Sequence, residues 1–472
     1  MKKLGFVEKL AYSAPAFSLA VVGIPVYVYI PKFYTDVVGV HIAAMGAILL
    51  FVRLFDALTD PVIGLFSDRL RTPIGRRRPL ILAGAVFTVL AIILLFNPPR
   101  AMGADMAGLW FTAWIFALFL FWTVVIVPYE SLGPELTYDY HERTALFSMR
   151  DGALIAGTMV AAAMPGLVGW AGGFDDSPDG RRQVFFVLSV IYGPLILAAC
   201  AWCVAVLRER PRINAHERLE VFRLLRSSLA NRPFRILLAA YTISAIGNNL
   251  PATLILYYVE YVLGSHRADM FLFLYFFTGI VFLPMWVKLS RMKGKKAAWL
   301  ASMGINTGAF FWVFFLGPGD EWLYGILVFF SGIGFGATLA IPSAIQADVI
   351  DYDELIAGDR REGLYIGLWS VAKKMAAAVG VGVGLVMLGA SGYQPGAAQS
   401  DAAIMTLRIF YALVPCLCNA LAIVIALGYP ISGAVHLQIR IAIEDKKAGR
   451  PAVDPLLSGP IAGKGGNTLW KR

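Results

Sequence analysis

The sequence predicts an all-α membrane protein with twelve transmembrane helices in two six-helix bundles. Apolar residues make up 58% of the 472-residue chain and charged residues only 15%. The mean hydropathy of +0.68 lies outside the range of soluble globular proteins. Apolar runs of about 20 residues recur along the chain. A strongly basic connection at residues 208–233 divides these runs into two equal sets.

Each set contains six apolar runs. The first set covers residues 10–34, 42–66, 80–96, 109–129, 146–170 and 184–207, and the second covers 234–262, 270–289, 297–316, 322–345, 364–388 and 404–429. The predicted domains are an N-terminal six-helix bundle, 1–207, a cytoplasmic linker, 208–233, a C-terminal six-helix bundle, 234–430, and a cytoplasmic tail, 431–472.

The basic residues indicate the orientation in the membrane. Of the 41 Lys and Arg residues, the odd-numbered connections hold only Arg100, Arg181, Arg182 and Arg267, and most others lie at the N-terminus, in the even-numbered connections and in the tail. By the positive-inside rule, both termini face the cytoplasm. We therefore expect a multi-pass protein of a bacterial-type plasma (inner) membrane, embedded in the lipid bilayer. The net charge of +10 follows from this bias and requires no nucleic-acid partner.

The second span carries charges that a lipid-facing helix would exclude. Arg53, Asp56 and Asp60 fall along one face of this helix, and its other faces are apolar. A charge at the centre of a bilayer costs about 2.5 to 3.5 kcal/mol, so this face should line a cavity inside the protein. Pro61 has no amide hydrogen and frees the carbonyl oxygen of Ala57. These oxygens favour a bound cation at this point of the helix.

The fourth span supplies further polar groups. Thr123 can face the two aspartates near mid-membrane, and Glu130 approaches the cytoplasmic end of the span. Arg150 follows in the fifth span. Glu130 and Arg150 are candidates for substrate coupling, and a cytoplasmic charge cluster that pins two helix ends is an equal alternative.

The connection after the second span, SDRLRTPIGRRRPL, combines an acid, a glycine and several arginines. We expect a cytoplasmic gate here, with salt bridges to neighbouring helix ends in one transport state only. A solvated, positively charged loop is the simpler alternative. The segment after the tenth span, DVIDYDELIAGDRR, supplies the remaining gate residues. The gate candidates are Asp68, Arg69, Gly75, Arg76, Arg77, Asp351 and Arg360.

Two spans of the second half also carry polar residues. In the seventh span, Asn248, Asn249 and a following proline interrupt an apolar run, which predicts a broken helix near mid-membrane. In the eleventh span, Lys373 and Lys374 are adjacent, so only one of them can face a given cavity. We expect one lysine to neutralise the aspartates, and the sequence leaves open which one. Trp369 either stacks on a ring of the solute or packs in the core.

Three segments together resemble one known family. DALTDPVIGLFSDR with GRRRP, PYESLGPELTYDYHERT and DVIDYDELIAGDRREGLY resemble the glycoside-pentoside-hexuronide:cation symporters, the melibiose-permease group of the major facilitator superfamily. The resemblance implies the twelve-helix fold of that superfamily and solute movement coupled to sodium, lithium or protons. It also implies a cation site at Asp56, Thr59, Asp60 and Thr123, and it aligns Lys374 with the family's lysine in helix eleven.

The resemblance is weaker where family members bind sugars. Acids expected in the first and fourth spans are replaced by Ala20 and Ile126, and Glu130 occupies a tryptophan position. Transporters of the same fold that move lysophospholipids keep the helix-two aspartates. We therefore expect a secondary active transporter that moves a sugar, glycoside, uronide or similar small organic solute by cation-coupled symport and alternating access. An amphipathic solute such as a lysophospholipid is the alternative.

A different class of protein also has a D-x-x-x-D pattern in a membrane helix. Intramembrane prenyltransferases bind magnesium diphosphate with such acids at a membrane face, whereas Asp56 and Asp60 lie well inside the span. The sequence has no G-x-x-x-x-G-K-[ST] loop for a nucleotide-driven pump. We therefore expect no enzyme activity, no structural metal, and no cofactor beside the transported Na+ or H+. We also expect a monomer.

Overall fold

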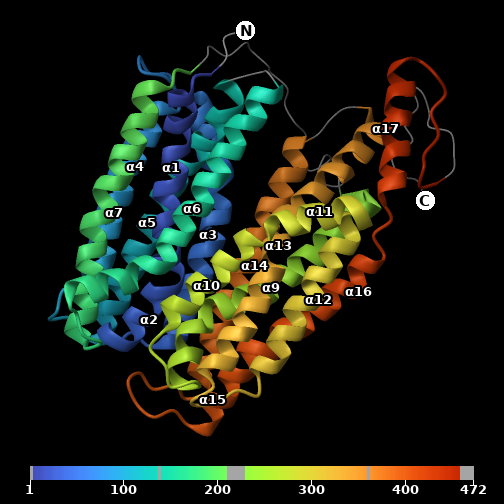
Figure 1. Ribbon diagram of the computed structural model, residues 1–472. Helices are drawn as coiled ribbons and strands as arrows, with labels where there is room; N and C mark the ends of the chain where they lie inside the picture. The colour runs from blue at the N-terminus through green and yellow to red at the C-terminus, as the bar shows by residue number, and fades with distance from the viewer. Residues whose placement is uncertain (1–3, 137–139, 210–228, 359–361, 458–472) are drawn as a thin grey trace. The chain divides into compact units, whose positions relative to one another are not determined.

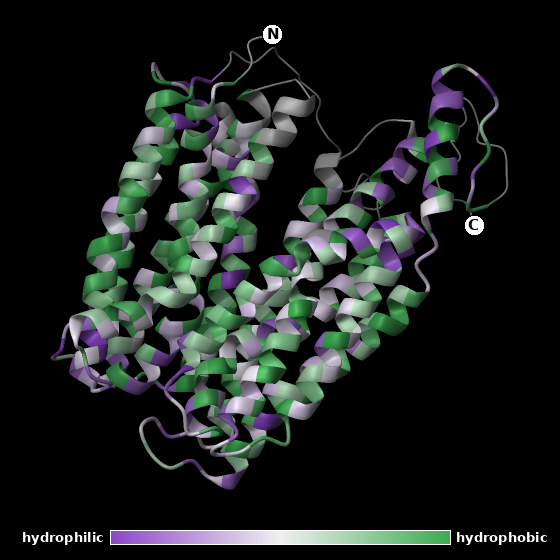
Figure 2. Ribbon diagram, viewed as in Figure 1, coloured by the Kyte–Doolittle hydropathy of each residue, from purple (hydrophilic) through white to green (hydrophobic). Residues whose placement is uncertain are grey.

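The computed structural model of the protein describes residues 4–136, 140–209, 229–358 and 362–457. Every regular element within these ranges is a helix (Figure 1). The helices consist largely of apolar residues, and polar residues lie mainly at helix ends and in connections (Figure 2). These features confirm the predicted all-helical membrane fold.

The first half of the chain forms the elements α1 to α7. They are α1 (Phe6–Ile24), the π-helical η1 (Pro25–Tyr29), α2 (Ile30–Phe33), the π-helical η2 (Tyr34–Val38), α3 (Ile42–Arg69), α4 (Arg78–Phe96), α5 (Ala104–Leu136), α6 (Tyr140–Gly172) and α7 (Pro178–Val206). The first four elements follow one another without a gap and form one apolar segment, Phe6–Val38. α1 packs against α6 and α7, and α4 packs against α5 and α7. α3 packs against α5, which brings the second and fourth predicted spans together.

The second half forms the elements α9 to α17. They are α9 (Arg232–Tyr261), α10 (Ala268–Val281), α11 (Leu283–Lys293), α12 (Lys295–Val313), α13 (Glu321–Ala357), α14 (Glu362–Ala390), α15 (Asp401–Arg408), the π-helical η3 (Ile409–Leu413), α16 (Val414–Leu427) and α17 (Gly433–Lys447). α10 and α11 meet at a bend of 42° and together are long and apolar enough to form one span.

Among the described residues, nine helices are long and apolar enough to cross a membrane, or ten if the bent pair α10 and α11 is one span. α9 and α12 are long enough, at 30 and 19 residues, but are less apolar. Asn248 and Asn249 lie within α9, and Lys295 and Lys296 begin α12. The described elements are consistent with the twelve predicted spans.

Proline residues lie inside helices without ending them. α3 runs through Pro61, and α9 runs through Pro251. The predicted break of the seventh span near Asn248 and Asn249 is therefore wrong. The side-chain amide of Asn249 donates a hydrogen bond to the carbonyl oxygen of Ala245 at 2.7 Å within the same helix. Membrane helices tolerate proline because side chains and neighbouring helices satisfy the polar groups around it.

The chain divides into two compact units. Unit 1 comprises Met1–Asn214, Ala252–Phe273 and Ala378–Leu407, and unit 2 comprises Ala215–Pro251, Leu274–Ala377 and Arg408–Arg472. The last parts of α9 and α14 therefore pack with helices of the first half of the chain. A Cβ atom at Gly46 of α3 would lie 2.9 Å from the Leu385 side chain of α14, so this close packing depends on the glycine. The predicted domain boundaries divide the sequence differently and stay a prediction.

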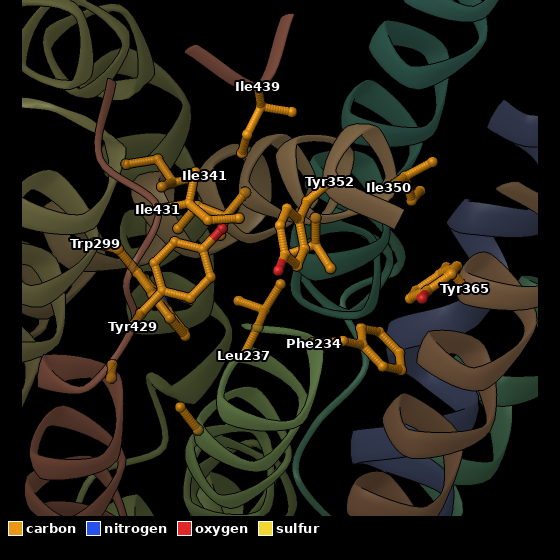
Figure 3. Packing of buried hydrophobic residues seen from close by; sticks show 14 of the residues in the cluster. Phe234, Leu237, Trp299, Ile341, Ile350, Tyr352, Tyr365, Tyr429, Ile431 and Ile439 are labelled. Carbon is orange, nitrogen blue, oxygen red and sulfur yellow. The ribbon is translucent and has the colours of Figure 1, made fainter. Parts of the chain in front are cut away.

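Unit 2 contains a buried cluster of hydrophobic side chains (Figure 3). Phe234 of α9, Trp299 of α12 and Tyr365 of α14 belong to it. Ile431 and Ile439, which follow the last predicted span, are buried in the same cluster. The described part of the predicted tail therefore includes a helix, α17, that packs on the core of unit 2.

Candidate functional site

Oxygen-bearing side chains meet between α3 and α5. The hydroxyl of Thr123 donates a hydrogen bond to Asp56 Oδ1 at 2.8 Å, and Thr123 Oγ1 lies 3.4 Å from Asp60 Oδ1. Thr123 is fully buried, and Asp56 is 5% exposed. The hydroxyl of Thr59 donates to the carbonyl oxygen of Asp56 at 3.1 Å. The structure thus brings all four predicted cation-binding residues into one group.

Helix geometry explains this arrangement. Asp56 and Asp60 are four residues apart on α3, so they are neighbours on one helix face. Pro61 lies in α3 directly after Asp60 and has no amide to donate to the carbonyl oxygen of Ala57. Carboxylate and carbonyl oxygens are costly inside an apolar helix unless donors or cations satisfy them. Thr123, on the helix that packs against α3, supplies one such donor.

This set of oxygens is suited to a small hard cation or to a proton. Two neighbouring carboxylates repel each other, and a bound cation or proton relieves that repulsion. Carboxylate and hydroxyl oxygens are the ligands that hard cations prefer. Among the described residues, no group of three or more His, Cys, Asp and Glu side chains could hold a metal ion.

Arg53 lies one turn before Asp56 and contacts aromatic side chains. Its guanidinium carbon is 4.0 Å from the centre of the Tyr27 ring and 4.8 Å from the centre of the Phe119 ring. It also donates a hydrogen bond to the hydroxyl of Tyr27 at 3.2 Å. Cation–π contacts of this kind contribute about 0.5 to 2 kcal/mol. Arg53 thus connects η1, α3 and α5 beside the aspartates.

Arg150 of α6 pairs with the next residue in the sequence. Its Nε and Nη2 atoms donate hydrogen bonds to Asp151 Oδ1 at 2.9 and 2.7 Å. The guanidinium carbon lies 4.9 Å from the centre of the Phe147 ring. Glu130 of α5 is exposed. This arrangement is compatible with a charge cluster at the helix ends, and a role of Glu130 and Arg150 in substrate coupling stays a prediction.

Glu209, which no motif in the sequence marks, organises the arginine-rich connection. Its carboxylate accepts hydrogen bonds from the backbone amides of Arg76, Arg77 and Arg78 at 2.9, 2.8 and 2.8 Å. Gly75 has a φ of +116°, and a Cβ atom there would lie 2.6 Å from Glu209 Oε1. A carboxylate at the start of α4 satisfies amides that lack helical partners and complements the helix dipole. In the sequence, Glu209 differs from its surroundings only as an acidic residue within a basic segment, which does not predict its contact with the arginine-rich connection.

The arginine side chains of this connection reach neighbouring helices. The Nη1 atom of Arg77, which is buried, donates a hydrogen bond to the carbonyl oxygen of Ser131 on α5. The Nε and Nη2 atoms of Arg78 donate to the carbonyl oxygen of Val204 on α7 at 3.0 and 2.5 Å. The connection is therefore anchored on α5 and α7. Release of these contacts in another transport state stays a prediction.

The remaining gate candidates have other surroundings. The side chains of Asp68 and Arg69 lie outside the described residues, and so does Arg360. Asp351, in the last turns of α13, is buried. Its Oδ2 atom lies 3.0 Å from Nε2 of His436 on α17. The structure therefore pairs Asp351 with the helix that follows the last span.

Asn248 belongs to a buried polar network in unit 2. Its Oδ1 atom accepts hydrogen bonds from the amides of Asn306 and Asn419 at 3.2 and 3.4 Å. Its own amide donates to the hydroxyl of Ser244 at 3.3 Å. The hydroxyl of Ser331 donates to Asn306 Oδ1 at 2.6 Å. This network connects α9, α12, α13 and α16, and such networks stabilise helix packing in an apolar bundle.

α14 carries three candidate residues. Trp369 is buried and stacks on Tyr241 of α9, with ring centres 3.9 Å apart and an interplanar angle of 27°. Because both residues pack in or against the buried cluster of unit 2, packing is sufficient to explain this tryptophan. Lys373 is exposed and Lys374 is partly buried. Lys374 is therefore the better candidate to face a cavity.

A model of the protein family described as MFS/sugar transport protein matches residues 11–433. A glucuronide carrier protein homolog of Escherichia coli (strain K12) is 28% identical over 89% of this chain and 91% of its own length. A putative glycoside/cation symporter of the same strain is 26% identical over 88% and 90%. A solved structure of a bacterial homologue of the human drug peptide transporters covers 93% of this chain and 98% of its own, with a TM-score of 0.66. At 11% identity, that likeness shows a shared fold alone.

Proposed function

Because the chain belongs to the MFS/sugar transport protein family, we propose that it is a cation-coupled symporter. The proposed solute is a sugar, glycoside, uronide or similar small organic molecule, and the proposed coupling ion is Na+ or H+. The glucuronide carrier homolog and the glycoside/cation symporter among its relatives support this class of solute. Membership of a transporter family decides against an intramembrane prenyltransferase.

One observation carries the cation coupling: the contact of Thr123 with both Asp56 and Asp60 inside an apolar helix pair. Two neighbouring carboxylates between apolar helices attract a cation. A bound cation lowers the negative charge of the site to which the solute is exposed. If the solute binds better when the cation is present, the cation binds better when the solute is present, by the same factor. The cation gradient then drives solute uptake by alternating access.

The proposed roles follow from burial and contacts. Asp56 is the more buried carboxylate and is oriented by the Thr123 hydroxyl, so it forms the fixed side of the site. Asp60 is only partly buried and forms the side from which the cation exchanges. Arg53, one turn before Asp56 on α3, offsets part of the negative charge and provides no oxygen ligand.

We also propose that both termini face the cytoplasm of a bacterial-type inner membrane and that one chain is the transporting unit. The concentration of Lys and Arg in the even-numbered connections, the N-terminus and the tail supports this orientation.

Ala20 and Ile126 narrow the choice of solute. Both stand where sugar-binding relatives of the resembled family carry acids, so fewer groups can hydrogen-bond sugar hydroxyls. Galactosides such as melibiose should therefore be poor substrates, because sugar hydroxyls that are buried without hydrogen-bond partners weaken binding strongly. The same two residues favour an amphipathic solute such as a lysophospholipid as the second candidate.

The test is uptake by purified protein in liposomes. Radiolabelled sugars, glycosides, uronides and lysophospholipids are screened with an imposed Na+ gradient, an imposed proton gradient, or neither. The proposal expects concentrative uptake of one polar solute with one of the two gradients. Uptake of lysophospholipids alone would favour the second candidate, and equal uptake with and without any gradient would overturn cation coupling.

A further inference from the structure

A cluster of ion pairs lies at the end of the first apolar segment, apart from the aspartates of α3. Lys32 Nζ is 2.6 Å from Asp36 Oδ2 and 2.7 Å from Glu260 Oε2. Lys32 is 7% exposed, and the side chains of Asp36 and Glu260 are 4% and 19% exposed. Charges buried to this extent are retained when they are paired. Lys32 therefore joins α2, η2 and α9 through one shared cation.

Tyrosine side chains surround these charges. Lys32 Nζ lies 4.9 Å from the centre of the Tyr257 ring and 4.8 Å from the centre of the Tyr261 ring. The hydroxyl of Tyr393 donates a hydrogen bond to Asp36 Oδ1 at 2.7 Å. Burial, with Tyr257 and Asp36 nearby, raises the pKa of Tyr393 far above its usual value, so its hydroxyl remains a neutral donor. Lys32 and Asp36 thus have tyrosine partners in addition to their ion pair.

The clasp, as we call this group, consists of Lys32, Asp36, Tyr257, Glu260, Tyr261 and Tyr393. Its members come from both halves of the sequence, and Asp36 and Tyr393 are 357 residues apart. They nevertheless belong to the same compact unit, unit 1. The clasp therefore ties ends of the second-half helices to the first apolar segment of the chain.

All parts of the clasp lie where a span leads into an odd-numbered connection. These are the connections after the first, seventh and eleventh predicted spans. In the proposed orientation, they face the outside of the membrane. A cavity of about 390 Å³ lies beside the clasp, and its lining includes Lys32, Glu260, Arg181 and Asp269. The Lys32 and Glu260 pair therefore borders an open space at the outer end of unit 1.

We propose that the clasp is the outer gate of the transporter, closed in this structure, and that its ion pairs separate when solute enters from outside. This inference rests on the proposed transport function and orientation. Lys32 has the central position because Asp36 and Glu260 share its charge. Without Lys32, the two carboxylates repel each other, and the closed form loses stability relative to the open form.

The test measures access from outside to a reporter cysteine in the first apolar segment. Gly23→Cys is suitable because a Cβ atom there meets only the Tyr27 ring, at 3.9 Å. A membrane-impermeant maleimide is added to spheroplasts, and the rate of reaction with the protein is measured. Protein without the reporter gives the background from the four native cysteines. The amount of folded protein is followed by size-exclusion chromatography.

We expect Lys32→Met and Glu260→Gln to raise the labelling rate about tenfold. Lys32→Met removes the cation that Asp36 and Glu260 share, and Glu260→Gln removes the ion pair between α2 and α9 while Lys32 keeps Asp36. Arg100→Gln is the matched control. This substitution removes an exposed ion pair, in which Arg100 Nη2 lies 3.2 Å from Asp179 Oδ1, and should leave the labelling rate unchanged.

The proposal is overturned if folded Lys32→Met and Glu260→Gln proteins react at the parent rate. It is also overturned if labelling becomes faster only in inside-out vesicles, or equally faster in Arg100→Gln. Tyr393→Phe removes the hydroxyl that contacts Asp36 and Tyr261 but no charge, so it tests the clasp even where the charge variants fail to fold. An unchanged rate in folded Tyr393→Phe would then count as failure. The reaction needs neither solute nor coupling ion, so its outcome is separate from that of the uptake experiments.

Discussion

Thr123→Val distinguishes sodium coupling from proton coupling. The Thr123 side chain is fully buried, and its hydroxyl donates to Asp56 at 2.8 Å. Valine fills nearly the same volume but lacks the hydroxyl. The substitution therefore removes one hydrogen-bond donor and one oxygen ligand while the packing of α3 against α5 is kept.

The contact gives the size of the effect. A hydroxyl that interacts with a charged group contributes about 1.5 to 3 kcal/mol, and we take this range for the Thr123 oxygen as a ligand of Na+. Since 1.4 kcal/mol corresponds to a factor of ten, loss of the hydroxyl should weaken Na+ binding about tenfold to a hundredfold. A proton behaves differently. A proton needs no second oxygen ligand beside the carboxylate that binds it, so the substitution removes no ligand of the proton.

The assay is solute uptake into proteoliposomes, titrated with Na+ at fixed pH and with protons in the absence of Na+. Thr123→Ser, which keeps the hydroxyl, is the control. Sodium coupling predicts that the half-saturating Na+ concentration rises about tenfold to a hundredfold in Thr123→Val and far less in Thr123→Ser. Proton coupling predicts that proton-driven uptake survives in both variants. Identical titration curves for the two variants in both assays would refute a role for this hydroxyl.

Two further predictions concern stability. Glu209→Gln keeps the shape but removes the charge that three backbone amides share, so the free energy of unfolding should fall by about 1 to 3 kcal/mol. The measurement is thermal aggregation of purified protein, with the exposed Asp105→Asn as control. Trp369→Ala should lower that free energy by about 3 to 5 kcal/mol, because it empties a stacked position in the core of unit 2. A stable Trp369→Ala protein that loses solute uptake would instead show that the tryptophan contacts the solute.

The sequence predicted the membrane fold well, because the apolarity of a span is a sum over about 20 residues and single residues hardly change it. The sequence also identified the α3 aspartates as candidate site residues, because charged residues inside an apolar helix are visible in the sequence alone. The proximity of Thr123 to Asp56 and Asp60 could be expected from matching depths in two spans, and the structure shows it.

Other features depend on tertiary contacts. Glu209 belongs to no motif, and its role becomes visible only in the structure, where the segment after α7 lies beside Gly75. Lys32 and Asp36 show a local signal, a pair four residues apart, but the partner Glu260 is distant in the sequence. The predicted break in α9 is wrong because polar residues next to a proline do not end this helix. In the structure, Asn249 bonds to a carbonyl of its own helix, and the helix continues.

The central claim is that the carboxylate pair of α3 couples a cation to the solute. The most direct measurement compares gradient-driven accumulation with solute exchange in the same proteoliposomes, for the parent, Asp56→Asn, Asp60→Asn and the control Asp105→Asn. Asparagine keeps the shape of aspartate and removes its charge, so Asp60→Asn should lose uphill accumulation and retain exchange, while Asp105→Asn keeps both. If Asp60 only held helices together, folded yield and exchange would fall alike. If Asp56→Asn and Asp60→Asn both accumulate solute as well as the parent under the same gradient, cation coupling at this site is contradicted.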